Sequence, residues 1–287
     1  MNVSNSSGDS PFDSLVTNPL IDTHAHLDER VFDADRDTVI RAARAVGVVG
    51  IVNIGYRPER WATTFDLTRR YPHVSCAIGL HPAYADDLTA ETVPSIASMV
   101  DASGVVAIGE IGLDFSRDYP AVDRQVAAFE AQLTLASHVS VPVIIHQRRA
   151  QTEVIETLAR FSTIQTVILH CFDGSSEMAQ FGIARGYYFG VGGLATRQSS
   201  VELRAVLASI PADHILLETD APYLVPSGIN DRRNSPINLP RICQRLADLW
   251  SLSPDAFAAV TTTNAHRALH LREMATAGAW NEGSRVR

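Results

Sequence analysis

The chain has few of the features that mark membrane proteins, disulfide-rich proteins and proteins that coat nucleic acid. Its 287 residues include three cysteines, too few and too scattered for a disulfide framework. No apolar run approaches the roughly 18 to 20 residues that a membrane span requires. Acidic residues outnumber basic ones by 32 to 24, and a net charge of −8 argues against a broad cationic surface for nucleic acid. A protein that acts on nucleic acid at a metal site is not excluded.

The two ends of the chain lack the patterns of folded elements. Residues 1–18 are rich in Ser and Asn and have neither the basic nor the apolar region of a signal peptide. We expect flexible tails at 1–18 and 274–287. The cysteines are interpreted as small buried thiols in a reducing compartment, so the sequence predicts a cytoplasmic protein. It predicts no membrane segment, and no obligate protein partner is evident.

Between the tails, short apolar runs alternate with segments of helical periodicity. Eight runs lie at 20–23, 48–54, 74–80, 105–111, 141–145, 166–169, 187–191 and 214–217. Eight strands alternating with helices predict one α/β domain over 19–273, a single (β/α)₈ TIM barrel. A doubly wound open sheet is the alternative, but the glycine-rich dinucleotide fingerprint that would favour it is missing after the first run.

Two histidines close the first apolar run in an H-x-H pattern. In an extended chain the side chains of His24 and His26 point to the same side, so both imidazoles can reach one metal ion. Asp22 and Asp28 make this patch richer in polar groups than a buried strand end tolerates without purpose. Chance H-x-H pairs are common, and the pair alone leaves both a metal site and two unrelated histidines open.

Ionisable residues stand at the ends of four further runs. Glu110 lies at the C-terminal end of the fourth, next to its last residue; His146 and His170 directly follow the fifth and sixth, and Asp220 comes shortly after the eighth. The C-terminal ends of barrel strands meet at one mouth, where active sites lie. Any one of these residues can be an ordinary polar group, but the repetition at five strand ends favours a shared metal site.

The predicted donor set is larger than one ion needs. Four histidines and two carboxylates exceed the ligands of one tetrahedral metal and suit two divalent ions that share a carboxylate. Mixed nitrogen and oxygen ligation suits Zn²⁺, Mn²⁺ or Mg²⁺. Such ions activate a water and polarise a phosphoryl or carbonyl oxygen, so the predicted reaction is metal-assisted hydrolysis.

The candidate residues belong to longer motifs at 21–28, 79–82, 109–114, 146–148, 170–175 and 218–224, and two further segments at 233–240 and 263–267 follow them. Together these segments resemble one known family, the TatD-like metal-dependent deoxyribonucleases of the amidohydrolase superfamily. The resemblance covers roughly residues 20–270 in order. It implies a slightly deformed TIM barrel and a Mg²⁺-, Mn²⁺- or Zn²⁺-dependent phosphodiesterase of the 3'-5' exonuclease type, acting on DNA or a small phosphodiester.

The resemblance also assigns ligands to two ions, and we expect Glu110 and Asp220 to carry the catalysis. Glu110 is the expected bridge, and Asp220 can both bind an ion and accept a proton from the attacking water. The departures from the family pattern are Ala25, where cysteine is frequent, and Asp173, which adds negative charge near the mouth. One ion is expected to bind His24, His26, Glu110 and Asp220, and the other Glu110, His146 and His170.

Three residues are weaker candidates for contacts with a substrate phosphate. His81 precedes a proline at the end of the third run and either contacts phosphate or caps a loop. Arg148 lies two residues after His146 and can hold phosphate in a bidentate manner or pair with a barrel carboxylate. Arg233 either adds to a local positive rim or belongs to a solvated face.

Two other functions compete with a nuclease. The same pair of ions supports hydrolysis of an amide, a lactone or an aminoacyl ester, as in aminoacyl-tRNA deacylation. Barrels that hydrolyse amides often carry a metal-bridging carboxylated lysine on strand 4, whereas this chain has Glu110 there and arginine as its only strongly basic residue. A non-catalytic metal-binding scaffold predicts the loss of a ligand, and none is lost.

Overall fold

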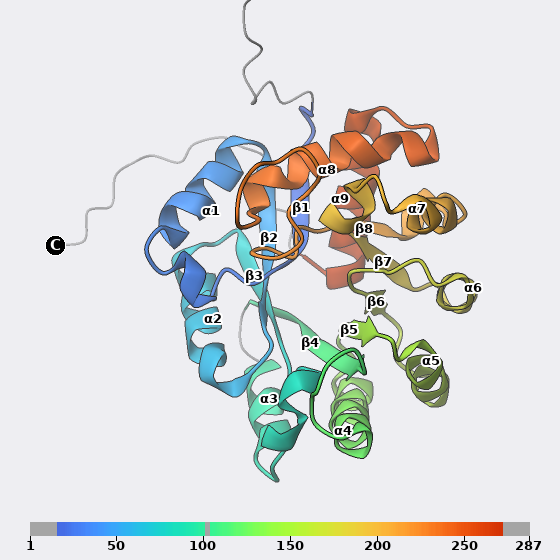
Figure 1. The fold of residues 1–287 in the computed structure, drawn as a ribbon. Coiled ribbons are helices and arrows are strands. Elements are labelled where there is room, and N and C mark those ends of the chain that lie inside the picture. The colour runs from blue at the N-terminus through green and yellow to red at the C-terminus, as the bar shows by residue number, and fades with distance from the viewer. Residues whose placement is uncertain (1–15, 101–103, 272–287) are drawn as a thin grey trace, which may run out of the picture.

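A barrel of eight parallel strands with helices around it forms the protein (Figure 1). The computed structural model describes residues 16–100 and 104–271. The strands run in chain order, as the sequence predicts, and are β1 Leu20–Ala25, β2 Val48–Gly55, β3 Val74–Ile78, β4 Val105–Asp114, β5 Val143–Arg148, β6 Val167–Leu169, β7 Tyr188–Val191 and β8 Ile215–Leu217.

Helices follow the strands and cover the outside of the barrel (Figure 1). Within the described ranges, none of them is long and apolar enough to cross a membrane. They are α1 Arg36–Ala45, α2 Pro58–Arg70, α3 Thr92–Val100, α4 Val122–Val139, α5 Gln151–Arg160, α6 Ser176–Ala184, α7 Val201–Leu207, α8 Leu239–Leu246 and α9 Pro254–Leu269.

One end of the barrel is plugged by the chain itself. The C-terminal part of α9 packs against side chains from the barrel interior, which leaves the opposite end, at the C-terminal ends of the strands, for a site. This interior cluster includes Ile21, Val52, Ala77, Ala107, Ile144, Ile168, Leu216, Ala265, Ala268 and Leu269.

The barrel closes between β1 and the segment after β8. A single bridge pairs Ala25 with Ala221. The Asp220 amide donates to the carbonyl of His24 at 2.9 Å, and the His26 amide donates to that of Ala221 at 2.7 Å. The backbone that joins the first and last strands therefore belongs to residues of the predicted site and their neighbours.

A buried carboxylate adds hydrogen bonds to this junction between β1 and the segment after β8, which we call the seam. Asp22 accepts hydrogen bonds from the Thr219 amide at 2.9 Å and from its hydroxyl at 2.6 Å. Burial raises the pKa of Asp22 to about 7, against the lowering effect of those hydrogen bonds. The hydroxyl of Thr23 adds a bond to the Leu217 carbonyl at 3.0 Å.

Two β-bulges position ligands of the predicted site. The register of β1 against β2 shifts between residues 22 and 25, and that of β4 against β5 shifts between residues 109 and 111. His24 and Glu110 lie within these shifts, and bulges re-aim side chains in this way beside active sites. The prediction that Glu110 ends its strand is wrong, because β4 resumes its pairing with β5 after the bulge and continues to Asp114.

Part of the predicted N-terminal tail packs on the barrel. Val16 is buried. The amides of Thr17 and Asn18 donate to Asp255 Oδ1 at 2.6 and 3.1 Å, at the start of α9. The remainder of the tail predicted at 1–18 and all of the tail predicted at 274–287 lie outside the described residues.

Candidate active site

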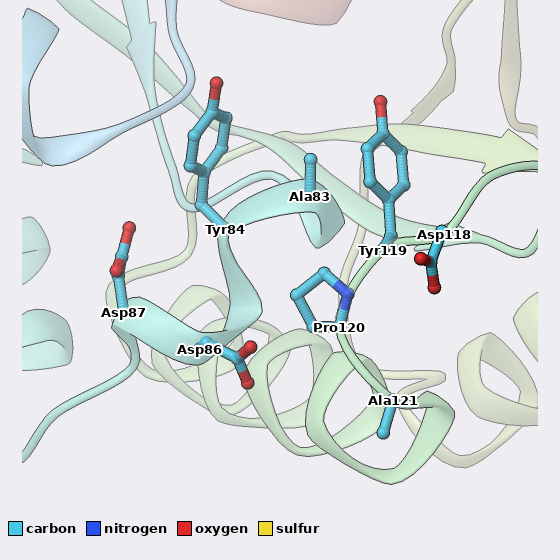
Figure 2. Close-up of a pocket in the computed structure, with 8 residues that line it drawn as sticks. All are labelled: Ala83, Tyr84, Asp86, Asp87, Asp118, Tyr119, Pro120 and Ala121. Atoms are coloured by element: carbon cyan, nitrogen blue, oxygen red, sulfur yellow. The ribbon is translucent and has the colours of Figure 1, made fainter.

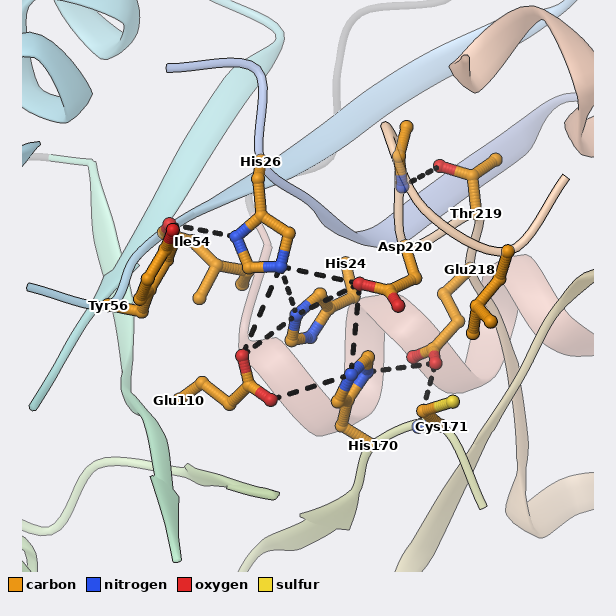
Figure 3. A network of polar contacts seen from close by, with 12 residues as sticks. His24, His26, Ile54, Tyr56, Glu110, His170, Cys171, Glu218, Thr219 and Asp220 are labelled. Carbon is orange, nitrogen blue, oxygen red and sulfur yellow. Dashed lines mark hydrogen bonds and ion pairs between the residues drawn. The ribbon is translucent and has the colours of Figure 1, made fainter. Parts of the chain in front are cut away.

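The structure brings all six predicted ligands together at the open end of the barrel, five of them labelled in Figure 3. Their side chains point toward one another from five different strands, and four of the six residues are buried. They are His24 from β1, His26 directly after β1, Glu110 from β4, His146 from β5, His170 directly after β6 and Asp220 shortly after β8.

Glu110 lies at the centre, and its two carboxylate oxygens face different groups. Oε2 lies 3.5 Å from His24 Nε2 and 4.0 Å from His26 Nε2. Oε1 lies 2.6 Å from His146 Nδ1 and 3.6 Å from His170 Nε2. One carboxylate thus lies between two sets of imidazole nitrogens.

Asp220 completes the set on the side of β1. Its Oδ1 lies 3.3 Å from His26 Nε2 and 4.0 Å from His24 Nε2, and these two nitrogens are 3.3 Å apart. The same oxygen is 3.9 Å from His170 Nε2. Asp220 has a φ of 54°, a left-handed conformation in which aspartate is enriched among non-glycine residues. The carboxylate therefore reaches both donor sets.

Two further carboxylates orient the imidazoles on the other side. Asp114 Oδ2 lies 3.1 Å from His146 Nε2, and Glu218 Oε1 lies 2.9 Å from His170 Nδ1. A carboxylate on the remote nitrogen fixes the orientation of a ligating histidine and raises its basicity. These contacts leave His146 Nδ1 and His170 Nε2 directed at Glu110.

In the part of the chain that the structure describes, the remote ring nitrogens of His24 and His26 have no carboxylate partner of this kind. His26 Nδ1 lies 3.3 Å from the carbonyl of Ile54. His24 Nδ1 is buried and has no hydrogen-bond partner among the described residues. The His24 ring instead stacks on that of His170, with centroids 3.4 Å apart.

Sequence reasoning did not assign an orienting role to Asp114 or Glu218. The sequence nevertheless contained a hint of both. Residues an even number of positions apart point to the same side of an extended chain. Asp114 follows Glu110, and Glu218 precedes Asp220, at such a spacing. The structure also explains Gly190, where a Cβ would lie 2.1 Å from Glu218 Oε2. Any larger residue at position 190 would displace the Glu218 carboxylate from this place.

The carboxylates of the centre are ionised. Burial alone would raise the pKa of Glu110, but the neighbouring His170 and His146 hold it well below its usual range. Burial also opposes ionisation of Asp220, and the hydrogen bond with His26 together with the charge of His170 lowers its pKa.

The histidines differ in how strongly they hold a proton. Burial lowers the pKa of His146 and His170, but carboxylates outweigh it: Glu110 and Asp114 raise that of His146 to about 9, and Glu218 and Glu110 raise that of His170 to about 10. Burial and the neighbouring His170 lower the pKa of His24. Buried carboxylates that hold protons on nearby imidazoles form a site that a cation fits, and its nitrogen and oxygen donors are those of divalent metals.

His81 combines features of both of its predicted roles. Its Nδ1 accepts a hydrogen bond from the Ala83 amide at 3.0 Å, which caps a 3₁₀ helix at Pro82–Asp87. Its Nε2 lies 3.9 Å from Glu110 Oε1. Burial and the charge of His146 lower the pKa of His81 to about 3, so the ring is neutral.

The two predicted arginines are placed differently. Arg148 is exposed at the end of β5, and no ion pair within the described ranges engages it. Arg233 pairs with Asp35, and its guanidinium lies over the Phe32 ring, 4.5 Å from the centroid. The geometry does not support a phosphate contact for Arg233, because its charge is already matched by Asp35.

Nitrogen and oxygen donors gathered at this end of a barrel place the protein among the metal-dependent hydrolases. The family described as TatD related DNase matches residues 21–270. The chain belongs to this family, as its sequence motifs predict.

Curated relatives and a solved structure agree with this assignment. The chain is 35% identical over 254 residues to the uncharacterized metal-dependent hydrolase YabD of Bacillus subtilis, covering 88% of this chain and 99% of the relative. It is 36% identical over 253 residues to the 3'-5' ssDNA/RNA exonuclease TatD of Salmonella typhimurium, covering 86% and 97%. The crystal structure of the TatD homologue YjjV of Escherichia coli K12 superposes with a TM-score of 0.84 at 31% identity, covering 88% and 98%.

Proposed function

We propose that this protein hydrolyses phosphodiester bonds of single-stranded DNA, as a 3'-5' exonuclease with two divalent metal ions. The observation that carries the proposal is the position of Glu110, whose two oxygens face two separate donor sets. The relative from Salmonella typhimurium is named a 3'-5' ssDNA/RNA exonuclease, which supports this choice of substrate.

The proposed ligands follow from the distances within the centre. Mg²⁺, Mn²⁺ or Zn²⁺ in both positions would supply an activated water and stabilise charge on the phosphoryl oxygens. We assign one ion to His24, His26, Glu110 and Asp220, and the other to Glu110, His146 and His170.

Asp220 is the proposed acceptor of the proton that the attacking water loses. Its lowered pKa keeps the carboxylate ionised. Its side chain is 13% exposed against 5% for Glu110, so water and substrate reach it more readily. A positioned base of this kind contributes about 10²- to 10⁴-fold to rate.

His81 and Arg148 are the proposed contacts of the substrate phosphate. His81 Nδ1 accepts from the Ala83 amide, so in the neutral ring the proton resides on Nε2, the nitrogen that faces the centre. His81 thereby presents a hydrogen-bond donor without a charge. Arg148 supplies a charge from the rim of the same mouth.

We also propose that the protein is cytoplasmic. Cys76, Cys171 and Cys243 are all free, as expected in a reducing compartment.

The test is a panel of substrates with the metal stripped and then restored. After exhaustive chelation, confirmed by elemental analysis, we expect hydrolysis of single-stranded DNA to stop, and to return with Mg²⁺, Mn²⁺ or Zn²⁺. A small phosphodiester and an aminoacyl-tRNA serve as the comparison substrates. A full rate without metal contradicts the mechanism, and faster cleavage of aminoacyl-tRNA than of DNA contradicts the substrate.

A further inference from the structure

A hollow of about 510 Å³ lies beside the candidate metal centre. It is formed by the 3₁₀ helix Pro82–Asp87 and by the segment that precedes α4. Tyr84 and Tyr119 stand on either side of Ala83, with their rings pointing the same way (Figure 2). The volume is within the range of small-ligand sites.

His81 links this hollow to the centre. The ring centroid of Tyr84 lies 6.5 Å from that of His81, and the ring centroid of Tyr119 lies 6.3 Å from it. His81 Nε2 in turn lies 3.9 Å from Glu110 Oε1. A base that is joined through its sugar to a phosphate at the centre can therefore contact the two tyrosines.

The Tyr84 ring is held in place before any ligand arrives. Its hydroxyl accepts a hydrogen bond from Arg57 Nη1 at 3.0 Å, and the Arg57 guanidinium lies 5.4 Å from the ring centroid. The ring of Tyr56 packs beside it at 5.8 Å. An aromatic ring fixed in this way loses little conformational freedom when a planar ligand stacks on it.

The charge of the hollow limits its occupant. Asp86, Asp87 and Asp118 line it. Asp86 pairs with Arg124 at 3.3 Å, and the other two carboxylates would repel a phosphate. Carboxylates accept hydrogen bonds from the amino groups on the edges of nucleobases, and tyrosine rings stack on the faces of nucleobases. The occupant that fits is a neutral, planar base, with its phosphate directed away toward the metal centre.

We propose that Tyr84 and Tyr119 form a stacking subsite for one unpaired nucleobase of the strand whose phosphate occupies the centre. This inference rests on the proposed function. In a duplex, stacking already occupies the faces of each base and pairing occupies its edges. Such a base cannot stack on the tyrosines, so the subsite selects single-stranded substrate. Tyr84 and Tyr119 are thus specificity-determining residues.

The test is a cycle that combines a protein change with a substrate change. The substrates are single-stranded oligonucleotides in which one nucleotide near the cleaved end, at each position in turn, carries an abasic tetrahydrofuran residue. With the wild-type protein, we expect the abasic residue at one position to raise KM by about tenfold or more. Tyr119→Ala should raise KM for the intact oligonucleotide by a similar factor, and should add nothing when that one base is missing. Tyr119→Phe keeps the ring and should restore the wild-type KM.

Two controls separate stacking from general damage. Tyr71→Ala removes a tyrosine after α2, at the opposite end of the barrel, and should leave KM for both substrates unchanged. Circular dichroism checks that each variant is folded, and methyl p-nitrophenyl phosphate, a diester without a base, reports on the centre itself. Additive effects of Tyr119→Ala and the abasic residue overturn the inference, as does an equal loss on the base-free diester. If the wild-type protein does not cleave DNA at all, the proposed function itself is contradicted, which is a different outcome from the failure of the stacking subsite.

Discussion

The two sides of the candidate centre are built differently. The seam side consists of His24, His26 and Asp220, and backbone hydrogen bonds between β1 and the segment after β8 hold it together. The sheet side consists of His146 and His170, which extend the regular ladder of β5 and β6, and each of its imidazoles has a carboxylate behind it.

The difference concerns protons as well as shape. On the seam side, burial lowers the pKa of His24, while that of His26 is raised because the hydrogen bond and charge of Asp220 outweigh burial. On the sheet side, carboxylates raise the pKa of both imidazoles, that of His146 to about 9 and that of His170 to about 10. A cation on the sheet side must displace protons at neutral pH, while His24 offers a neutral nitrogen. The two sides should therefore bind metal with different dependence on pH.

Glu110→Ala removes the group that both sides share and should have the largest effect. We expect metal content to fall at both positions and kcat/KM for the phosphodiester to drop by about 10³-fold or more, as for other residues that act as a unit. Elemental analysis and steady-state kinetics measure the two losses. Glu130→Ala, in α4 and away from the centre, is the matched control. A variant that retains two ions per chain would falsify the role of Glu110 as a bridge.

Asp220→Asn tests the proton acceptor on the seam side. The amide keeps the shape and one oxygen ligand but lacks basicity, so much of the metal should remain while kcat falls by about 10²- to 10⁴-fold. Metal content and kcat are measured on the same preparation. Asp213→Asn, at the plugged end of the barrel, should change neither. A kcat near that of the wild type, with metal retained, removes Asp220 from proton transfer.

Asp114→Asn tests the carboxylate support of the sheet side. Loss of such a partner typically costs 10- to 100-fold in metal affinity, and we expect this cost in one of two binding steps during titration of the metal-free protein. The other step, on the seam side, should be unchanged. Asp123→Asn, an exposed position in the first turn of α4, is the control. Equal weakening of both steps would contradict the distinction between the two sides.

The pH dependence of the metal-free protein should show the smallest effect. The pKa values of His146 and His170 are raised above the ordinary value of about 6.5. Protonation of these residues therefore stabilises the folded state fully below about pH 6.5, and this contribution is lost as pH rises through about 9 and 10. We expect the Tm to fall by a few degrees between pH 7 and pH 10.5.

Calorimetry gives an independent check of the same protons. Metal binding at pH 8 should release protons, so the observed heat should change with the ionisation enthalpy of the buffer. The His146→Gln/His170→Gln double variant should lose the part of the proton release that these two residues contribute, and with it their part of the pH-dependent decline of Tm. A flat Tm in the metal-free wild-type protein would contradict protonation of the sheet side.

The barrel was predictable from the sequence because each strand is a local apolar run, but the strand ends were not. The fourth run was expected to end at Ile111, whereas β4 continues to Asp114. Its length is set by pairing with β5, a contact between segments distant in the chain that periodicity does not contain. The bulge at Glu110 has the same origin.

The candidate ligands were predictable because strand ends converge in a barrel, whereas their supporting partners depend on distances across strands. Glu218 was visible only as a neighbour of Asp220, and its contact with His170 emerges when β6 and β8 lie near each other. Arg233 illustrates the converse, because its partner Asp35 is 198 residues away and takes it out of the substrate site. Local motifs carry the chemistry, and long-range packing decides which side chains are free to perform it.

The seam also means that the site can form only after the segment that follows β8 has been synthesised. Asp22 and Thr219 are 197 residues apart, and the backbone bonds of His24 and Asp220 lie beside them. During synthesis, β1 emerges long before the segment after β8, so the N-terminal ligands must wait for their partners. A nascent chain that ends before residue 220 therefore lacks part of the candidate centre, and the complete set of predicted ligands can assemble only late in synthesis.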